Sequence, residues 1–323
     1  MLAAHRAAKG KREKANVLQF FSHLEENIQI LIHELENRTY QPGEYNTFNI
    51  YEPKPRMISA APFRDRVVHH ALLNVIEPLF ERSFIFDSYA NRVGKGTHCA
   101  IRRYQKFLRS HEYVLKCDIK KYFASIDHEI LKVLLRKRVA DKKVLWLIDV
   151  IIDNSNHQEN VIDYFPGDDL FTPLSRRKGL PIGNLTSQFY ANVYLNQLDH
   201  FVKEILHCPA YIRYVDDFVL FSNLKSQLKE WLDQLSCFLI KLRLKLNTTH
   251  CSIYPARIGG RFLGQLIFRT HRRLASDNVK RFKKRLRKWQ NRKPANVQQC
   301  IASWVGHAKQ ADTEQLLMSL GLF

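Results

Sequence analysis

Hydrophobic and polar positions recur along this chain with two periods, one typical of helices and one typical of strands. Helical spacing of apolar residues predicts helices over 17–35, 65–80 (ending near Pro78), 128–139, 184–206 and 225–244. Runs rich in β-branched and aromatic residues predict strands over 112–119, 211–222 (as a hairpin), 251–254 and 261–268. Residues 154–177 break both patterns and form a polar loop. The pattern predicts an α+β fold.

The division of the chain follows from its length and from a change near residue 269, where a mixed sequence becomes strongly basic. A chain of 323 residues suits two or three subdomains around a cleft. We predict an N-terminal helical extension over 1–40, a mixed central region over 41–268 and a basic helical region over 269–323. The last of these contains twelve Lys or Arg residues between 269 and 293 against one acid, Asp277.

The charge balance points to a polyanionic partner. Lys and Arg total 51 against 31 Asp and Glu, a formal net charge of +20, which attracts nucleic acid. No apolar stretch is long enough to span a bilayer, and the basic N-terminus lacks the apolar core of a secretory signal. We therefore expect a cytoplasmic protein with no membrane partner. The six scattered cysteines indicate reduced thiols and no zinc module.

Two adjacent aspartates at the predicted hairpin tip are the strongest chemical signal. Asp216 and Asp217 stand between apolar strands, where burial of unpaired charge is costly unless a cation is present. Asp118 ends another apolar strand. If the strands are neighbours, three carboxylates can hold two Mg²⁺ ions, with Mn²⁺ as an alternative. An Asp pair taken alone is more often a solvated turn, and Asp168-Asp169 in the polar loop is such a case.

Several blocks of the sequence resemble reverse transcriptases. The hairpin Tyr214-Val215-Asp216-Asp217 is similar to the hallmark motif of that family, and other blocks occur in the family's order. These are KPRMISAAPFRDRVVHHAL (54–72), DSYANRVGKGTHCAIRR (87–103), LKCDIKKYFASIDH (115–128), LPIGNLTSQFYANVYLNQLD (180–199) and GGRFLGQLIF (259–268). The resemblance implies a right-hand polymerase: fingers and a palm with an antiparallel sheet packed on helices over 41–268, then a helical thumb.

One block narrows the resemblance. Residues 182–188 read Ile-Gly-Asn-Leu-Thr-Ser-Gln, where intron and retron enzymes usually carry a proline-glutamine-glycine segment. This form looks like the reverse transcriptases of diversity-generating retroelements, and the segment 301–308 is similar to that group as well. The resemblance implies an enzyme that copies a template-repeat RNA into adenine-mutagenised cDNA. It also implies an oligomeric accessory variability protein as partner, beside dNTPs and the RNA–cDNA hybrid.

The resemblance assigns further residues to the site. Lys54, Arg56 and Arg66 are candidate triphosphate ligands; Arg56 is preferred because the planar guanidinium fits phosphate oxygens. Phe123 matches the family's steric gate against a ribose 2′-hydroxyl. The remaining candidates are Ile182 and Gln188 at the nucleotide, His250 as general acid, and Lys280, Arg281, Lys284, Arg285 and Lys288 as ligands of the duplex backbone.

Each assignment has a plainer alternative. The basic residues could be solvated surface charges, Phe123 could pack in the core, and His250 could be structural. For the whole protein, one alternative is another bacterial reverse transcriptase, of the retron, group II intron-like or defence-associated kind. The other is a catalytically silent RNA-binding scaffold, against which the three aspartates argue, because a pure binder gains nothing from carboxylates facing an anionic ligand.

Overall fold

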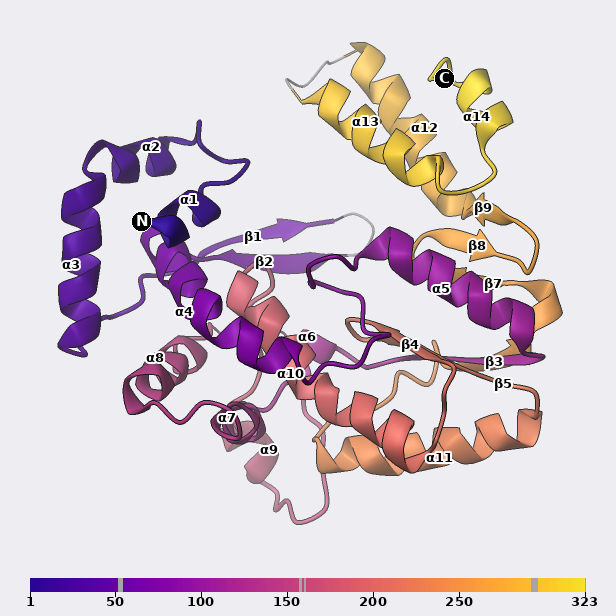
Figure 1. Cartoon of the computed structure of the whole chain (residues 1–323), viewed down its shortest axis with the longest axis horizontal. Coiled ribbons are helices and arrows are strands. Elements are labelled where there is room, and N and C mark those ends of the chain that lie inside the picture. Colours follow the sequence, from indigo (N-terminus) through magenta and orange to yellow (C-terminus); the bar gives the residue numbers. More distant parts are fainter. Residues whose placement is uncertain (52–54, 157–158, 160, 292–295, 323) are drawn as a thin grey trace. The chain divides into compact units, whose positions relative to one another are not determined.

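The computed structural model describes the chain except for residues 52–54, 157–158, 160, 292–295 and 323 (Figure 1). The chain folds into two compact units, each built from three stretches of sequence. Unit 1 comprises Met1–Ile85, Ile119–Phe201 and Ser236–Leu246, and unit 2 comprises Phe86–Asp118, Val202–Leu235 and Asn247–Phe323. The predicted division into 1–40, 41–268 and 269–323 stays a prediction, because the units interleave along the sequence.

Unit 1 is mainly helical, with one two-stranded antiparallel ladder. Strands β1 (Asn46–Ile50) and β2 (Arg56–Ala60) pair with Phe48 opposite Ile58. The helices are α1 (Leu2–Ala7), α2 (Ala15–Ser22), α3 (Leu24–Glu36), α4 (Phe63–Glu81), α6 (Tyr122–Ser125), α7 (His128–Arg136), α8 (Lys142–Asp153), α9 (Thr172–Ser175) and α10 (Leu185–His200). Helix α10 is buried on almost all sides, so it forms the centre of this unit.

Unit 2 contains a four-stranded antiparallel sheet in the order β4-β5-β3-β6. Its strands are β3 (Tyr113–Asp118), β4 (Tyr211–Tyr214), β5 (Asp217–Ser222) and β6 (Ser252–Pro255). Consecutive residues of β3, such as Val114 and Leu115, are both fully buried, so both faces of the sheet are covered. In Figure 1, α5 (Thr97–Ser110) and α11 (Lys225–Lys241) lie on opposite sides of these strands.

A three-stranded sheet and three helices complete unit 2. The strands β7 (Gly260–Phe262), β8 (Gln265–Ile267) and β9 (Arg272–Leu274) are antiparallel and consecutive. The helices are α12 (Ser276–Asn291), α13 (Val297–Ala308) and α14 (Glu314–Ser319). Phe282 of α12 stacks on Trp304 of α13 with ring centroids 3.7 Å apart. Aromatic packing therefore joins the basic helix α12 to its neighbour.

The structure corrects several predicted boundaries. The single helix predicted over 17–35 is two helices, because His23 leaves helical geometry at φ −128° and ψ 45°. Helix α4 ends at Glu81, so Pro78 lies inside the helix and does not end it. The strand predicted over 261–268 is the hairpin β7-β8, since Leu263 and Gly264 both have positive φ and form a turn. The helix predicted to reach 206 becomes a π-helix over Phe201–Ile205. Among the described residues, no helix combines the length and apolar character that crossing a bilayer requires.

Candidate active site

The sheet of unit 2 brings Asp118 and Asp217 face to face. Strand β3 ends at Asp118, β5 begins at Asp217, and these two residues are direct partners in the antiparallel register. Direct partners have Cα atoms roughly 4.5–5.5 Å apart and side chains on one face of the sheet. Two carboxylates that are far apart in the sequence therefore meet at one end of the sheet, because the two strands are neighbours.

A two-residue turn places Asp216 beside this pair. Tyr214 pairs with Asp217, so only Val215 and Asp216 lie between β4 and β5. Val215 has φ 58°, a conformation that β-branched residues rarely adopt. The turn is held by Arg213, which is fully buried and donates from Nη1 to the Val215 carbonyl oxygen at 3.0 Å. The backbone at the hairpin tip is thus fixed in an unusual conformation by a buried cation.

The environment of Asp217 disfavours its ionised form. Burial, together with the charge of nearby Asp118, raises the pKa of this carboxyl to about 6, although Lys116 opposes the rise. The Lys116 ammonium lies 3.4 Å from Oδ2. The other oxygen, Oδ1, is buried and has no hydrogen-bond partner among the described residues. An unpartnered buried carboxylate oxygen is costly and fits a site for a positively charged ligand.

These residues fit a divalent cation in part. Asp118 and Asp217 supply hard oxygen ligands that face each other, and Asp216 adjoins them on the turn. Asp118 also accepts a hydrogen bond from the Asn247 side chain at 3.0 Å, which orients its carboxylate. In the described part of the chain, no three His, Cys, Asp or Glu side chains are already grouped to hold a metal ion. The assignment of all three aspartates to two Mg²⁺ ions, with Mn²⁺ as the alternative, stays a prediction.

Unit 1 carries the residues predicted to hold the nucleotide. Lys54 lies outside the described residues, and Arg56 is exposed at the start of β2. Arg66 lies in the first turn of α4, where its Nε donates to the Ala61 carbonyl oxygen at 2.8 Å. Gln188, in the first turn of α10, lines the same cavity as Arg66. The structure brings these last two together, and their role stays a prediction.

The remaining nucleotide candidates are held by backbone hydrogen bonds in unit 1. The carbonyl oxygen of Ile182 accepts from the Ser59 amide at 2.8 Å, which ties the segment before α10 to strand β2. Phe123 in α6 is half-buried, and its carbonyl oxygen accepts from the Leu180 amide at 2.8 Å. A partly exposed ring on an anchored backbone suits either a steric gate or core packing. The assignment of Phe123 stays a prediction.

His250 lies in unit 2, as the aspartates do. Its side chain is exposed, with Nδ1 3.1 Å from the Thr249 hydroxyl oxygen. The histidine lowers the pKa of Asp217, so the two groups are within electrostatic reach of each other. This placement suits a proton donor beside the aspartates, and the general-acid role stays a prediction.

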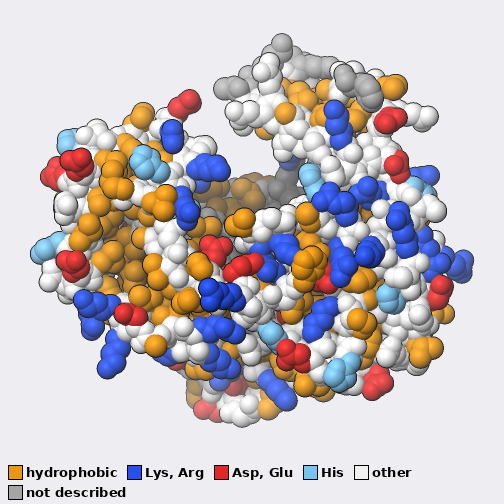
Figure 2. All heavy atoms as spheres, viewed as in Figure 1, with side chains coloured by type: hydrophobic (Ala, Val, Ile, Leu, Met, Phe, Trp, Pro, Cys, Tyr) orange, Lys and Arg blue, Asp and Glu red, His pale blue; other side chains and the backbone are white. Residues whose placement is uncertain are grey.

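Basic side chains cover α12, the helix predicted to contact the duplex backbone. Lys280, Lys284, Arg285 and Lys288 are exposed, whereas Arg281 is half-buried and its guanidinium lies 3.1 Å from Asp277. Sequence reasoning missed a second basic face. Figure 2 shows Lys and Arg side chains gathered over α5, whose exposed basic residues are Arg102, Lys106 and Arg109.

Three residues of the aspartate site were also missed from the sequence. Lys116 precedes Asp118 by two residues, so strand periodicity places both on one face of the sheet and could have found it. The buried Arg213 stands next to the recognised motif. Asn247 lies in a loop far along the chain and carries no sequence signal for its contact with Asp118.

Comparison with known proteins defines the class to which this fold and site belong. Residues 49–267, well over half of the chain, match the family described as reverse transcriptase (RNA-dependent DNA polymerase). The chain belongs to the reverse transcriptase family. The predicted enzyme class, an RNA-directed DNA polymerase, is confirmed.

Individual relatives come from bacterial and intron-encoded proteins. The chain is 27% identical to Protein YkfC of Escherichia coli (strain K12), with 78% of this chain and 74% of that protein covered. It is 26% identical to the group II intron-encoded protein LtrA of Lactococcus lactis subsp. cremoris, with 56% of this chain but only 29% of LtrA covered. The chain therefore spans less than a third of this larger relative.

A solved structure shows the same fold. Apo telomerase from Candida tropicalis superimposes with a TM-score of 0.51 at 14% sequence identity, covering 71% of this chain and 47% of the telomerase chain. At this identity the likeness shows the fold alone. The predicted α+β fold of right-hand polymerases is confirmed.

Proposed function

We propose that this protein is the reverse transcriptase of a diversity-generating retroelement, which copies a template-repeat RNA into adenine-mutagenised cDNA. The segment 182–188 carries the proposal, because its sequence resembles that group and differs from the intron-type pattern. Residues 182–184 of this segment precede α10 and residues 185–188 form its first turn, while the Ile182 carbonyl oxygen accepts from the Ser59 amide of β2. An oligomeric accessory variability protein is the proposed partner, beside template RNA, the RNA–cDNA hybrid and dNTPs.

In the proposed reaction the protein mainly positions its substrates and balances charge. Asp118, Asp216 and Asp217 would hold two divalent ions, which when bound activate the attacking hydroxyl and offset charge on the leaving pyrophosphate. Lys116 keeps Asp217 partly neutralised, and Asn247 orients Asp118. Arg56 and Arg66 would meet the triphosphate, and exposed His250 would donate a proton to the leaving group.

Primer extension on an RNA template tests the assignment of the aspartates. We expect Asp216→Asn and Asp118→Asn each to lower the extension rate by roughly a hundredfold or more, because charge stabilisation in the transition state depends on the bound ions. Asp169→Asn is the matched control: that aspartate is exposed in the polar loop of unit 1. Full activity of Asp216→Asn would refute the metal assignment.

Sequencing of the cDNA tests the finer proposal. Errors concentrated at template adenines would support membership of a diversity-generating retroelement, and errors spread evenly over the four bases would contradict it. The relatives among intron-encoded proteins favour one alternative, a group II intron-like enzyme. A variable repeat and an accessory gene beside the gene for this chain would favour the diversity-generating retroelement over the group II intron-like enzyme.

A further inference from the structure

Two cysteines that are far apart in the sequence meet beside the aspartate site of unit 2. Strands β3 and β6 pair with Lys116 opposite Ser252. One further step in this antiparallel register sets Cys117 opposite Cys251. The two side chains are hydrogen-bonded to each other, and both are free thiols. The fold therefore holds a pair of thiols at the end of the sheet where Asp118 lies.

The separation of these two positions suits a covalent bond. Direct partners on antiparallel strands have Cα atoms roughly 4.5–5.5 Å apart, and disulfides join Cα atoms about 4.4–6.8 Å apart. The two side chains already contact each other, so a bond between them needs no large rearrangement of the strands. In reducing compartments, disulfides are usually transient and redox-sensing. The pair thus has the geometry of a dithiol that closes on oxidation.

The two thiols differ in their access to solvent. Cys117 is buried, with 0% of its surface exposed, whereas Cys251 is half-buried just before β6. The susceptibility of a thiol to oxidation follows its access to the oxidant. A small oxidant such as hydrogen peroxide therefore attacks Cys251, and Cys117 is placed to react with the oxidised product.

Main-chain hydrogen bonds connect Cys251 to Asp118. The Asp118 amide donates to the Cys251 sulfur, and the Cys251 amide donates to the Asn247 carbonyl oxygen at 3.1 Å. The Asn247 amide in turn donates to the Asp118 carbonyl oxygen at 2.8 Å. Cys117 and Asp118 are consecutive in a strand, so their side chains lie on opposite faces of the sheet. The thiols therefore act on Asp118 through the backbone and do not fill its site.

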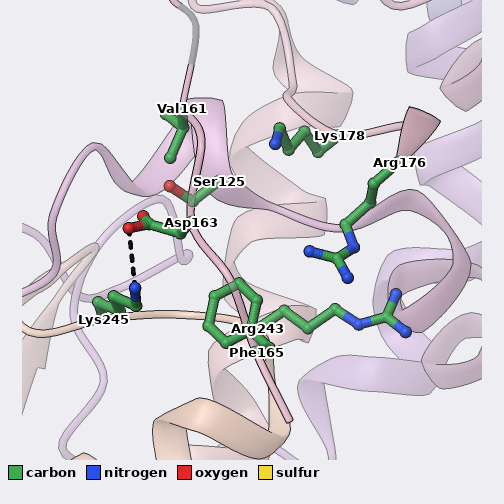
Figure 3. Close-up of a pocket in the computed structure, with 8 residues that line it drawn as sticks. All are labelled: Ser125, Val161, Asp163, Phe165, Arg176, Lys178, Arg243 and Lys245. Atoms are coloured by element: carbon green, nitrogen blue, oxygen red, sulfur yellow. Dashed lines mark hydrogen bonds and ion pairs between the residues drawn. The ribbon is translucent and has the colours of Figure 1, made fainter. Parts of the chain in front are cut away.

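The chain just before this turn is tied down within unit 1 (Figure 3). Lys245 lies 2.9 Å from Asp163, and its carbonyl oxygen accepts from the Lys120 amide at 2.9 Å. The guanidinium of nearby Arg243 lies 2.6 Å from an Asp127 oxygen. These contacts hold the segment that leads into Asn247. The turn from Asn247 to Cys251 therefore has to absorb a movement of Cys251.

Closing a disulfide causes such a movement. The bond places the two sulfurs about 2.05 Å apart, well inside any non-bonded contact, so the Cys251 sulfur moves toward Cys117 and away from the Asp118 amide. Asn247 is bonded to both Cys251 and Asp118, so it transmits the change to the carboxylate that it orients. A misplacement of about 1 Å at a reacting centre can cost roughly a hundredfold in rate. Oxidation is therefore expected to weaken the site.

We propose that Cys117 and Cys251 form an oxidation site, at which a peroxide joins the two thiols in a reversible disulfide that lowers the activity of the Asp118 site. The formation of the bond is independent of the proposed function, and only its effect on activity rests on that function.

The chemistry of the step is balanced by the peroxide alone. The Cys251 sulfur attacks one peroxide oxygen, the O–O bond breaks and a water leaves, which gives a sulfenic acid. The Cys117 sulfur then attacks the Cys251 sulfur, the S–O bond breaks, and a second water leaves with the Cys117 proton. Two thiols and one peroxide thus give one disulfide and two waters. A dithiol reductant reverses the bond by thiol–disulfide exchange.

Peptide mapping tests whether the bond forms. The full chain is treated with hydrogen peroxide, the excess is removed, free thiols are alkylated, and the chain is digested without reduction. We expect a linked pair of peptides that contain Cys117 and Cys251 and that dithiothreitol separates. Cys251→Ser and Cys117→Ala should each abolish it. Cys300→Ser is the matched control and should keep it, because Cys300 is also half-buried in unit 2 but lies on α13. Absence of the linked pair from the oxidised wild-type chain would overturn the proposal.

Primer extension tests the effect of the bond on activity. The rate of each oxidised variant is divided by the rate of the same variant after reduction, so that a change caused by the substitution itself cancels. We expect this ratio to fall at least tenfold for the wild-type chain and for Cys300→Ser, and to stay near one for Cys251→Ser and Cys117→Ala. An equal fall in all four would show that oxidation acts elsewhere, and an unchanged rate in the linked wild-type chain would show that the bond controls nothing.

Binding of Mn²⁺, followed by electron paramagnetic resonance of the free ion, gives a readout that needs no polymerisation. Oxidation should lower the Mn²⁺ affinity of the wild-type chain and not that of Cys251→Ser. Lower affinity in a chain that polymerises nothing would support the oxidation site and contradict only the proposed function. In such a chain, a linked pair of peptides with unchanged Mn²⁺ affinity would overturn the proposal.

Discussion

At Asp217, folding and function make opposite demands on the protonation state of one side chain. Its carboxyl is largely buried beside Asp118, so folding disfavours ionisation and raises its pKa to about 6 from the ordinary 3.8. Ion binding requires the carboxylate, which forms as the pH rises through 6. The affinity of the site for divalent ions should therefore fall below about pH 6, where Asp217 is protonated.

The raised pKa also predicts a pH-dependent change in stability. A carboxyl whose folded-state pKa is raised costs no stability below its unfolded pKa; the cost grows between about pH 4 and 6 and is complete above pH 6. Asp217→Asn should therefore increase the free energy of unfolding in EDTA at pH 8 by on the order of 2 kcal/mol, with the gain shrinking toward pH 4. Urea denaturation across this range measures it, and a variant that is less stable at every pH would contradict the explanation.

At the scale of elements, two glycines of unit 2 have opposite roles. Gly260 begins β7 under the hydrogen-bonded hydroxyls of Tyr104 and Tyr254, and a Cβ there would lie 1.9 Å from the Tyr104 oxygen. Gly306 lies inside α13, where a Cβ would have no neighbour within 4 Å. The first glycine is required by packing, and the second only weakens a helix.

Substitution by alanine should separate these roles. Gly260→Ala should destabilise the chain by about 1–3 kcal/mol, because the tyrosine pair must move. Gly306→Ala should stabilise it by about 0.5–1 kcal/mol, because alanine restricts the unfolded chain and favours the helix. Thermal unfolding of both variants checks the pair, and a neutral Gly260→Ala would show that the tyrosines yield easily.

At the scale of the whole molecule, the net charge is +20, and exposed lysines occur on more than one helix of unit 2. The exposed lysines of α12 are predicted to contact phosphates without sequence preference. Exposed lysines on other helices of the same unit, such as Lys225 and Lys229 on α11, share the i, i+4 spacing of Lys280 and Lys284. The net charge alone would make the two pairs equivalent, whereas a specific contact would not.

The salt dependence of binding distinguishes these cases. Substituting Lys280 and Lys284 by Gln should lower the slope of log K against log salt for an RNA–DNA hybrid by about 1.5, since each phosphate contact contributes ~0.7–0.9. The same change at Lys225 and Lys229 should leave the slope nearly unchanged. If the substitutions at the two pairs lower the slope equally, the hybrid responds to the overall charge of the protein, and α12 makes no specific contact with it.

The sequence by itself determined the local parts of this protein. The apolar run that ends at Asp118, the hairpin around Asp216 and the basic amphipathic helix α12 follow from periodicity and from the cost of burying charge. Element boundaries were less predictable: the break at His23 and the turn at Leu263 depend on backbone angles that the apolar pattern does not encode.

Only the tertiary structure decided which distant residues meet. The register that sets Asp118 opposite Asp217, the hydrogen bond from Asn247, and the contact between the Cys117 and Cys251 thiols join positions far apart along the chain. Such contacts depend on how strands pair and helices pack, and a local pattern of polar and apolar residues carries no information about that partner choice. The chemistry of the site could be predicted from its residues, but its geometry required the fold.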